Sequence, residues 1–175
     1  MPSAEIRPFS SRRDFGRVLD YFLKADEAFL RGMGVAPARL PPRNEWLERL
    51  AAELRKSDAE KKTFYVAWIY KGKRVGHSNI NKIRYGAEAY MHLHIWTPEL
   101  RAAGLGQEFL KLSANEFLRR FRLKRLLCEP WAKNPAPNKA LARAGFRFVR
   151  RYRTVPGLIN FSQSVNRFEL TRKIA

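Results

Sequence analysis

Three consecutive strand-like segments between residues 64 and 96 constrain the fold more than any other part of the sequence. The segment FYVAWIY (64–70) is rich in β-branched and aromatic residues, which favour strands. A Lys-Gly-Lys turn follows it, and a second strand is expected from Arg74 to about Arg84. A third strand is expected at 89–96. Strands joined by such short turns pair antiparallel, so this part of the chain predicts the centre of a sheet.

The third segment, AYMHLHIW, alternates in character along its length. Because side chains alternate between the two faces of a strand, one face is expected to carry the apolar residues Met91, Leu93 and Ile95. The opposite face is expected to carry Tyr90, His92, His94 and Trp96. The first face suits packing in a core, whereas the second offers groups that form hydrogen bonds or titrate.

Helices and further strands are expected on both sides of this run. The spacing of apolar residues predicts helices over 13–31, 44–56 and about 105–121, and a short helix after Pro135 that Gly145 ends. Further strands are expected at 125–132, 146–155 and 166–170. This order predicts a mixed α/β fold around one sheet. With 175 residues and no linker-like segment, a single domain over 1–175 is expected.

The charge of the chain is large and unevenly distributed. There are 35 Lys and Arg residues against 16 Asp and Glu, which gives a formal net charge of +19. Residues 61–175 hold 24 of the basic and only 6 of the acidic side chains. Such an excess indicates an anionic partner, such as nucleic acid, the ribosome or a phosphate-rich cofactor. The alternative is the arginine-rich composition that a GC-rich gene produces.

Several classes of protein are disfavoured by what the sequence lacks. The single cysteine, Cys128, cannot form an internal disulfide or a cysteine-based zinc site. No apolar run is long enough to cross a membrane, and the first residues lack the apolar stretch of a secretory signal. We therefore expect a cytoplasmic protein with no membrane partner.

A glycine-containing segment, Arg-Ala-Ala-Gly-Leu-Gly at 101–106, lies between the third strand and the long helix. Glycines let a backbone approach a ligand closely, and the start of a helix offers free N–H groups and a positive dipole end. Together these features predict a cradle for a pyrophosphate. Taken alone, a Gly-x-Gly at a helix start is also a common tight turn. The segment matches neither a P-loop nor a dinucleotide-binding fingerprint.

Two sequence blocks resemble the GCN5-related N-acetyltransferase (GNAT) superfamily. Arg-x-x-Gly-x-Gly after HLHIWTPEL resembles its acyl-CoA signature. The later block CEPWAKNPAPNKALARAGF resembles the second conserved block, in which an asparagine, here Asn134, precedes a short helix that ends in Gly-Phe. The resemblance covers roughly 5–172, and the pattern is most similar to the ribosomal-protein N-terminal acetyltransferases.

The resemblance implies an acyl-CoA N-acyltransferase fold: a single mixed, mostly antiparallel sheet with a splayed central strand pair, flanked by helices. The splayed strands would be 89–96 and 125–132, with the pantetheine arm of acetyl-CoA inserted between them. The implied cofactor-binding residues are His94, Ile95 and Trp96 for the pantetheine amides, Arg101, Ala102, Ala103, Gly104, Leu105, Gly106 and Gln107 for the pyrophosphate, and Asn134 for the arm. The family is metal-free, so no metal is expected.

Glu129 is the first candidate for the base that removes a proton from the acceptor amine. It stands five residues before Asn134, as the glutamate of the ribosomal-protein acetyltransferases does. Burial within an apolar strand would raise its pKa toward the working range of a base. The alternative is a structural carboxylate paired with an arginine such as Arg125 or Arg150. His92 and His94 are further candidates, because histidine titrates near neutral pH.

The chain departs from the family at the general acid. Many members place a tyrosine four residues before the glycine of the second block, and Leu141 occupies that position here. The proton for the departing thiolate would then come from Tyr90, Tyr152 or water.

The acceptor site in this family is built from the first two helices, their connector and the last two strands. Candidate acceptor-binding residues are Asn79, Asn81 and Tyr152. Because a polycationic acceptor calls for an acidic pocket, the basic chain favours the amine of a protein or peptide, such as an N-terminus presented on a ribosome. The alternatives are a small amine (an aminoglycoside, a polyamine or a metabolite) and a non-catalytic basic module that binds RNA or the ribosome.

Overall fold

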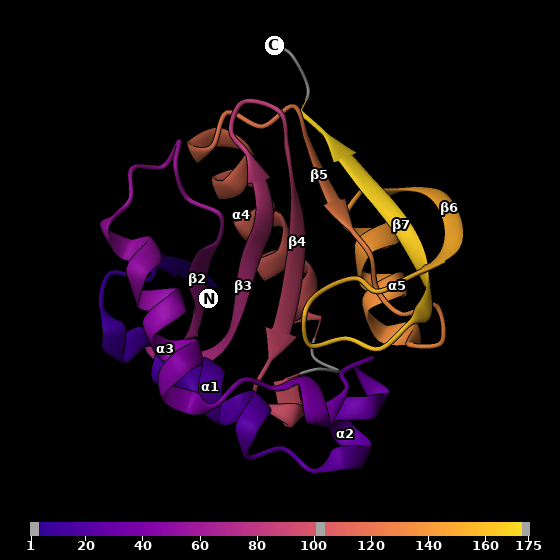
Figure 1. The fold of residues 1–175 in the computed structure, drawn as a ribbon. Coiled ribbons are helices and arrows are strands. Elements are labelled where there is room, and N and C mark those ends of the chain that lie inside the picture. Colours follow the sequence, from indigo (N-terminus) through magenta and orange to yellow (C-terminus); the bar gives the residue numbers. More distant parts are fainter. Residues whose placement is uncertain (1–3, 101–103, 173–175) are drawn as a thin grey trace.

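The computed structural model describes residues 4–100 and 104–172, and its centre is one seven-stranded sheet (Figure 1). The strands are β1 (Glu5–Pro8), β2 (Phe64–Tyr70), β3 (Lys73–Arg84), β4 (Glu88–Ile95), β5 (Arg125–Cys128), β6 (Arg147–Thr154) and β7 (Gln163–Thr171). Their order across the sheet is β1-β2-β3-β4-β5-β7-β6. All neighbours are antiparallel except β4 and β5, which are parallel. The mixed, mostly antiparallel sheet that the sequence predicts is confirmed.

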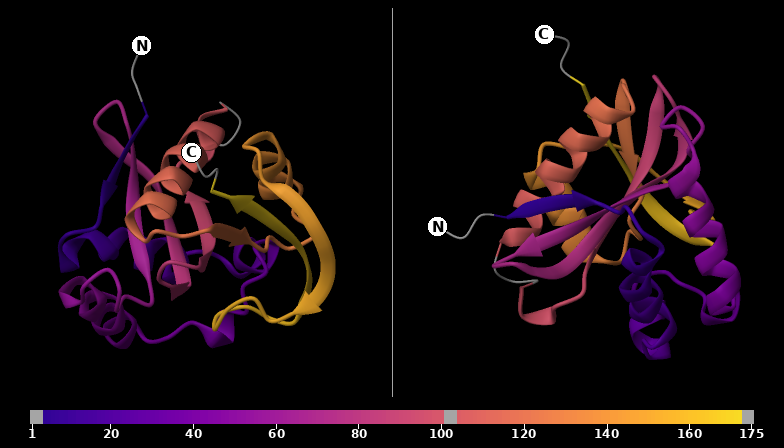
Figure 2. Two further views of the ribbon diagram at one scale, coloured as in Figure 1. Left: turned by 90° about the horizontal axis from the view of Figure 1, so that it is seen from above. Right: turned by 90° about the vertical axis from the view of Figure 1, so that its left-hand side faces the viewer.

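Within the described residues, five α-helices cover the two faces of this sheet (Figure 2). They are α1 (Gly16–Leu23), α2 (Glu27–Gly32), α3 (Arg43–Ala52), α4 (Leu105–Arg120) and α5 (Pro135–Arg143). The first three lie on one side of the sheet, and α4 and α5 lie on the other. None of the helices in the described part of the chain is long and apolar enough to cross a membrane.

Each face of the sheet has its own apolar core. On the α4 side, the Trp68 ring stacks on Phe109 with 4.9 Å between ring centroids. The Trp68 indole also donates a hydrogen bond to the Ser113 hydroxyl at 2.9 Å, so its one polar atom is satisfied. On the α1 side, Leu19 and Phe22 pack in a second cluster that includes Ala67 of the sheet. The two cores hold the sheet between rigid layers.

The single helix expected over 13–31 is wrong, because two helices occupy this region. The first, α1, ends at Leu23, and Asp26 begins α2 by accepting a hydrogen bond from the Phe29 N–H at 2.7 Å. An aspartate in this position satisfies a free N–H of the first helical turn and so starts a helix in a new direction. The apolar spacing continues across the break, which hid the break in the sequence.

The strands differ from the prediction in two places. The four-residue edge strand β1 was not predicted, since it is short and ends in a proline. The strand expected at 125–132 ends at Cys128, and beyond it only an isolated bridge joins Trp131 to Val165. Pro130 has no N–H with which to continue the ladder. Glu129 therefore lies just after the strand rather than within it.

The loop between β6 and β7 is fastened to the segment after α2. The Ala36 N–H donates to the Ile159 carbonyl at 2.8 Å, and the buried Gln163 side chain donates to the Gly34 carbonyl at 2.8 Å. The Asn160 amide donates to the same Gly34 carbonyl at 2.9 Å. These bonds join the N-terminal helices to the last two strands on the α1 side of the sheet.

Gly34→Ala is expected to destabilise this attachment. The backbone of Gly34 has φ of +80°, and an added Cβ would lie 2.3 Å from Oε1 of Gln163. Strain and displacement of Gln163 should lower the free energy of unfolding by roughly 1–3 kcal/mol, measured by denaturant titration. Gly32→Ala is the matched control, since it lies at the end of α2 with open space around it. Equal stabilities for the two variants would contradict this account.

Candidate active site

The parallel pair β4 and β5 separates along its length. Their register covers only three residue pairs, from Glu88–Arg125 to Tyr90–Leu127, whereas β4 continues to Ile95. Where the pairing ends, the Cys128 thiol donates to the Met91 carbonyl at 3.0 Å. A gap between the two strands therefore begins beside Cys128, within the sheet.

The backbone orientation of β4 decides which groups point into this gap. The Trp96 N–H donates to the Val75 carbonyl of β3 at 2.8 Å, so it faces away from the gap. Along an antiparallel pair the orientation alternates, which gives His94 the same direction as Trp96. By the same alternation, the main-chain groups of Leu93 and Ile95 point toward β5. Of the three residues expected to meet the pantetheine amides, His94 and Trp96 direct their main-chain groups toward β3, and Ile95 directs them toward β5.

The start of α4 lies against the end of β4. Gly104 precedes the helix with φ of +74°, a left-handed conformation that favours glycine. At Gly106 an added Cβ would lie 3.3 Å from Cδ1 of Ile95, so the first turn of α4 sits close over the strand. The Gln107 side chain donates to the Arg143 carbonyl at 2.8 Å and ties α4 to α5. The predicted residues Arg101, Ala102 and Ala103 lie outside the described residues.

Asn134 stands immediately before α5, as predicted, and its side chain makes no capping bond to the helix. Its carbonyl accepts from the Asn138 side chain at 2.6 Å. The same Asn138 side chain donates to the Trp131 carbonyl at 3.0 Å and accepts from Asn166 of β7 at 2.7 Å. Asn138 thereby fixes the turn after β5, a role that the sequence pattern did not indicate.

Glu129 is nearly buried and already paired. Its Oε1 accepts from Nε of Arg167 at 2.7 Å and from the Tyr152 hydroxyl. The Arg167 guanidinium also donates to the hydroxyls of Tyr152, at 2.6 Å, and Tyr90, at 3.0 Å. The side chain of Glu129 is only 5% exposed. Glu129 is therefore paired with an arginine, as the alternative to a catalytic base predicted, but that arginine is Arg167 and not Arg125 or Arg150.

The two tyrosines of this cluster stay protonated. Burial, together with the hydrogen bond to Glu129, raises the pKa of Tyr152 to about 12. Burial also raises the pKa of Tyr90. Leu141, at the position of the family tyrosine, is fully buried in the core and offers no proton. Burial raises the pKa of the Cys128 thiol to about 12, so this cysteine is a poor nucleophile.

The histidines lie on the α1 side of the sheet, as the alternation predicts. The His94 ring packs against Tyr21, Phe22 and His77, with 4.9 Å between the centroids of the two imidazoles. The Trp96 indole donates to Nδ1 of His77 at 2.9 Å. His92 lies on the same face, and burial with the nearby Lys82 cation lowers its pKa to about 4. His92 is therefore neutral near pH 7.

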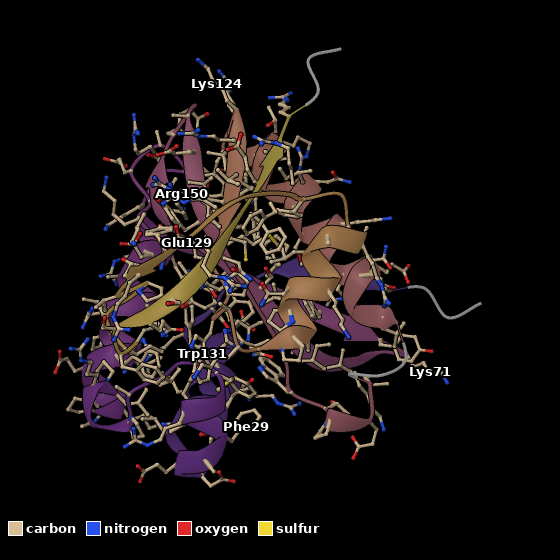
Figure 3. All side chains as sticks on the ribbon, turned by 90° about the vertical axis from the view of Figure 1, so that its right-hand side faces the viewer. Phe29, Lys71, Lys124, Glu129, Trp131 and Arg150 are labelled. Atoms are coloured by element: carbon tan, nitrogen blue, oxygen red, sulfur yellow. The ribbon has the colours of Figure 1, made fainter. Side chains whose placement is uncertain are left out.

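The predicted acceptor residues also reach this face. Asn79 is opposite His92, and Asn81 is opposite Tyr90, in the β3–β4 register. Tyr152 joins them through its contacts with Glu129 and Arg167. Figure 3 shows Glu129 between Arg150 and Trp131 on the side of the molecule formed by β6 and β7. Predicted residues from β3, β4 and β6 thus lie in one polar region with Glu129, which follows β5.

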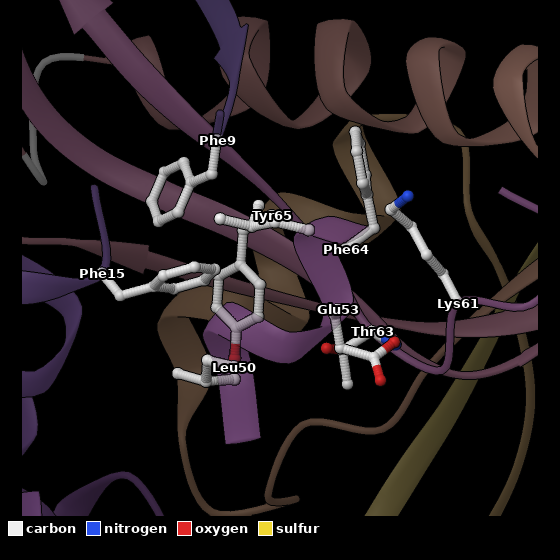
Figure 4. A pocket seen from close by; sticks show the side chains of 9 residues that line it. Phe9, Phe15, Leu50, Glu53, Lys61, Thr63, Phe64 and Tyr65 are labelled. Carbon is white, nitrogen blue, oxygen red and sulfur yellow. The ribbon is translucent and has the colours of Figure 1, made fainter. Parts of the chain in front are cut away.

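A separate cavity beneath α3 is too small to receive an acceptor (Figure 4). It lies among Phe9, Phe15, Leu50 and Tyr65 and has a volume of about 10 Å³. That volume is about the space of one water molecule. Nor does any group of three or more His, Cys, Asp or Glu side chains in the described ranges form a candidate metal site.

The strand gap, the glycine-bounded helix start and the second block together match a known family. A family model for the acetyltransferase (GNAT) domain matches residues 4–147. The chain belongs to the GNAT acetyltransferase family. It is an N-acetyltransferase with acetyl-CoA as its acyl donor. No curated protein matches the sequence.

Solved structures of this fold are similar over nearly the whole chain. RimL, a ribosomal alpha-N-protein acetyltransferase in complex with coenzyme A, is 16% identical with a TM-score of 0.76, over 97% of this chain and 94% of its own. A spermidine N-acetyltransferase from Vibrio cholerae is 14% identical with a TM-score of 0.76, over 96% and 95%. An aminoglycoside acetyltransferase is 10% identical with a TM-score of 0.74, over 98% and 96%. At these identities the likeness shows the fold alone.

The buried neutral histidines predict a loss of stability in mild acid. Burial, with repulsion from the other two histidines, holds the pKa of His77 well below its usual value, and the pKa of His92 is about 4. In the unfolded chain each would protonate near pH 6.5. Each therefore contributes stability that is present above pH 6.5 and is lost as the pH falls, by about 1.4 kcal/mol per pH unit.

Denaturant titration of the wild type and of His92→Phe between pH 7 and 4.5 measures this effect. The free energy of unfolding of the variant should depend less steeply on pH, by about the contribution of one histidine. Parallel curves for the two proteins would show that folding does not lower the pKa of His92.

Proposed function

We propose that this acetyltransferase transfers the acetyl group of acetyl-CoA to the amine of a protein or peptide, and that residues 1–175 act as one domain. The observation that carries the proposal is the positive charge of the acceptor region. Its one buried carboxylate, Glu129, is neutralised by Arg167, while Lys82 and the exposed Arg150 stand over the rings of Tyr90 and Tyr152. Among the described residues, the carboxylates near this region (Glu88, Glu129 and Glu169) are all paired with arginines, so a polyamine or aminoglycoside would meet unpaired cations there.

The geometry around the gap fits acetyl-CoA. Main-chain groups of Leu93 and Ile95 point toward the space in which the pantetheine amides would lie, and the side chain of Asn134 would contact the arm. The N–H groups at the start of α4 suit a pyrophosphate, together with Arg101, Ala102 and Ala103 by resemblance. When bound, acetyl-CoA supplies the thioester that the acceptor amine attacks.

We propose that Glu129 positions its neighbours rather than removing the proton. Its Oε1 already accepts two hydrogen bonds, so it compensates the Arg167 charge and holds Tyr152 beside the gap. The neutral His92 is then the candidate proton acceptor. Tyr90 and Tyr152, both protonated, are the side chains of this region that can return a proton to the departing sulfur.

Gly106→Glu should abolish binding of acetyl-CoA, because the added Cβ would lie 3.3 Å from Cδ1 of Ile95 and the carboxylate would bring a negative charge to the helix start proposed to bind the phosphates. Calorimetric titration of the purified protein with acetyl-CoA measures the loss. Asn115→Glu is the control, since it puts the same charge on an exposed position farther along α4. Unchanged affinity in Gly106→Glu would overturn the assignment of the loop.

Glu129→Gln distinguishes the two roles of Glu129. The amide oxygen can still accept from Arg167 and Tyr152, so a positioning role predicts a fall in kcat of less than about 10-fold with a peptide acceptor. A fall of about 10²–10⁴-fold would instead assign the general base to Glu129. Calorimetry with acetyl-CoA confirms in either case that the donor site is intact.

The choice of acceptor is tested by measuring kcat/KM for short peptides with a free N-terminus, for spermidine and for an aminoglycoside. The peptide is expected to be the best of the three. If spermidine or the aminoglycoside were acetylated faster, the small-amine alternative would replace the proposal.

A further inference from the structure

Two buried polar atoms on the acceptor side have no hydrogen-bond partner among the described residues. They are Oδ1 of Asn81 and Nε2 of His92. In the β3–β4 register Asn79 is opposite His92 and Asn81 is opposite Tyr90, so Asn81 and His92 are diagonal neighbours on one face of the sheet. Diagonal neighbours of this kind lie within reach of one small ligand group.

An unsatisfied buried polar atom is costly, at about 1–3 kcal/mol each. Among the described residues, these are the two buried side-chain nitrogen or oxygen atoms that lack a hydrogen-bond partner, and they lie on neighbouring residues. This indicates that their partner is a group that arrives with the substrate. The Asn81 oxygen can only accept, and the neutral imidazole of His92 can accept at Nε2. The missing partner is thus a donor with at least two N–H groups, which is the description of a primary amine.

The charges around this pair favour an amine that gives up its proton easily. Lys82, next to Asn81, lies 4.7 Å above the Tyr90 ring and donates to the Pro156 carbonyl at 3.0 Å. Arg167 from β7 faces the same region, and its charge is balanced by Glu129. Burial and an uncompensated cation both favour the neutral form of a bound amine. An α-amine, with a pKa of about 7.7–8.0, reaches that form far more readily than a lysine-type amine near 10.4.

We propose that Asn81 and His92 receive the acceptor amine, and that Lys82 makes the site select α-amines over lysine side chains and polyamines. The inference rests on the proposed function and names the acceptor class. The neutral amine donates one N–H to each residue, and its lone pair attacks the thioester carbon. The C–N bond forms as the C–S bond breaks. The proton that the nitrogen loses passes to Nε2 of His92 and then to solvent, which balances the thiolate released.

Asn81→Leu and His92→Phe test the receiving pair. Each should lower kcat/KM for a peptide α-amine by about 10-fold or more, with acetyl-CoA affinity unchanged in calorimetry. Each should also keep or raise the thermal midpoint of the free protein, because an unpaired buried polar atom is removed. Asn115→Leu on α4 is the control. Wild-type acceptor kinetics in both variants would overturn the inference, and so would a lowered thermal midpoint with loss of acetyl-CoA binding.

Lys82→Met tests whether Lys82 makes the site prefer α-amines over lysine side chains and polyamines. Without the cation, the pKa of the bound amine rises, so the midpoint of the pH profile of kcat should move to higher pH by about half a unit or more. The preference for a peptide α-amine over spermidine at pH 7 should narrow as well. Lys124→Met is the matched control, since Lys124 is an exposed lysine just before β5, at the top of Figure 3, apart from Glu129. An unshifted profile in Lys82→Met would refute the selection.

Different results would contradict the proposed function and this inference. If the wild type binds acetyl-CoA but acetylates no peptide, the protein-acceptor proposal fails. The role of Asn81 and His92 is then tested with the small amine that is acetylated best. The same two variants are used, and kcat/KM and the thermal midpoint are measured as before.

Discussion

The site depends on the early end of β5. Its ladder with β4 covers three residue pairs, and beyond it the Pro130 carbonyl accepts from the Asn166 N–H of β7 at 3.1 Å, so this part of the chain follows β7. The Ala132 N–H also donates to the Ser164 carbonyl at 2.9 Å, and Glu129 forms an ion pair with Arg167, so backbone bonds and a charge pair both join the chain beyond Cys128 to β7. Because these contacts keep the end of β5 against β7, β4 continues to Ile95 with β3 as its one paired neighbour among the described strands. The opening in the sheet therefore begins where the chain after β5 stays with β7, and the Glu129–Arg167 pair at that point also contacts the hydroxyls of Tyr90 and Tyr152.

The distribution of ion pairs explains how a chain with a net charge of +19 folds compactly. Of the six acidic residues after position 60, Glu88, Glu116, Glu129 and Glu169 form ion pairs with arginines. By contrast, no arginine of β6 forms a salt bridge within the described residues. Acidic groups are thus used to hold elements together, and positive charge remains over the surface beside the acceptor region. This surface makes an anionic or neutral acceptor molecule easier to accommodate than a polycation.

Much of the architecture followed from local patterns in the sequence. The strand at Phe64–Tyr70 was predicted with its observed bounds, and the alternation along 89–96 placed His92 on the correct face. What failed was governed by contacts between distant residues. Asp26 breaks a continuous apolar pattern, and the arginine that pairs with Glu129 comes from a strand 38 residues later. The orphaned atoms of Asn81 and His92 depend on the register between two strands, so their pairing could not be read from either segment alone.

The hydrogen bonds between the β6–β7 loop and the segment after α2 indicate the order in which parts of the protein fold. Asn160 and Gln163 bind the Gly34 carbonyl across 126 and 129 residues of chain. Such contacts close late, since the intervening loop must first be ordered. During synthesis the N-terminal helices and the first strands emerge long before Gln163 is made. A chain that still lacks β6 and β7 can therefore pair β1 to β5, but it gains the Glu129–Arg167 contact and the attachment at Gly34 only after β7 has been made.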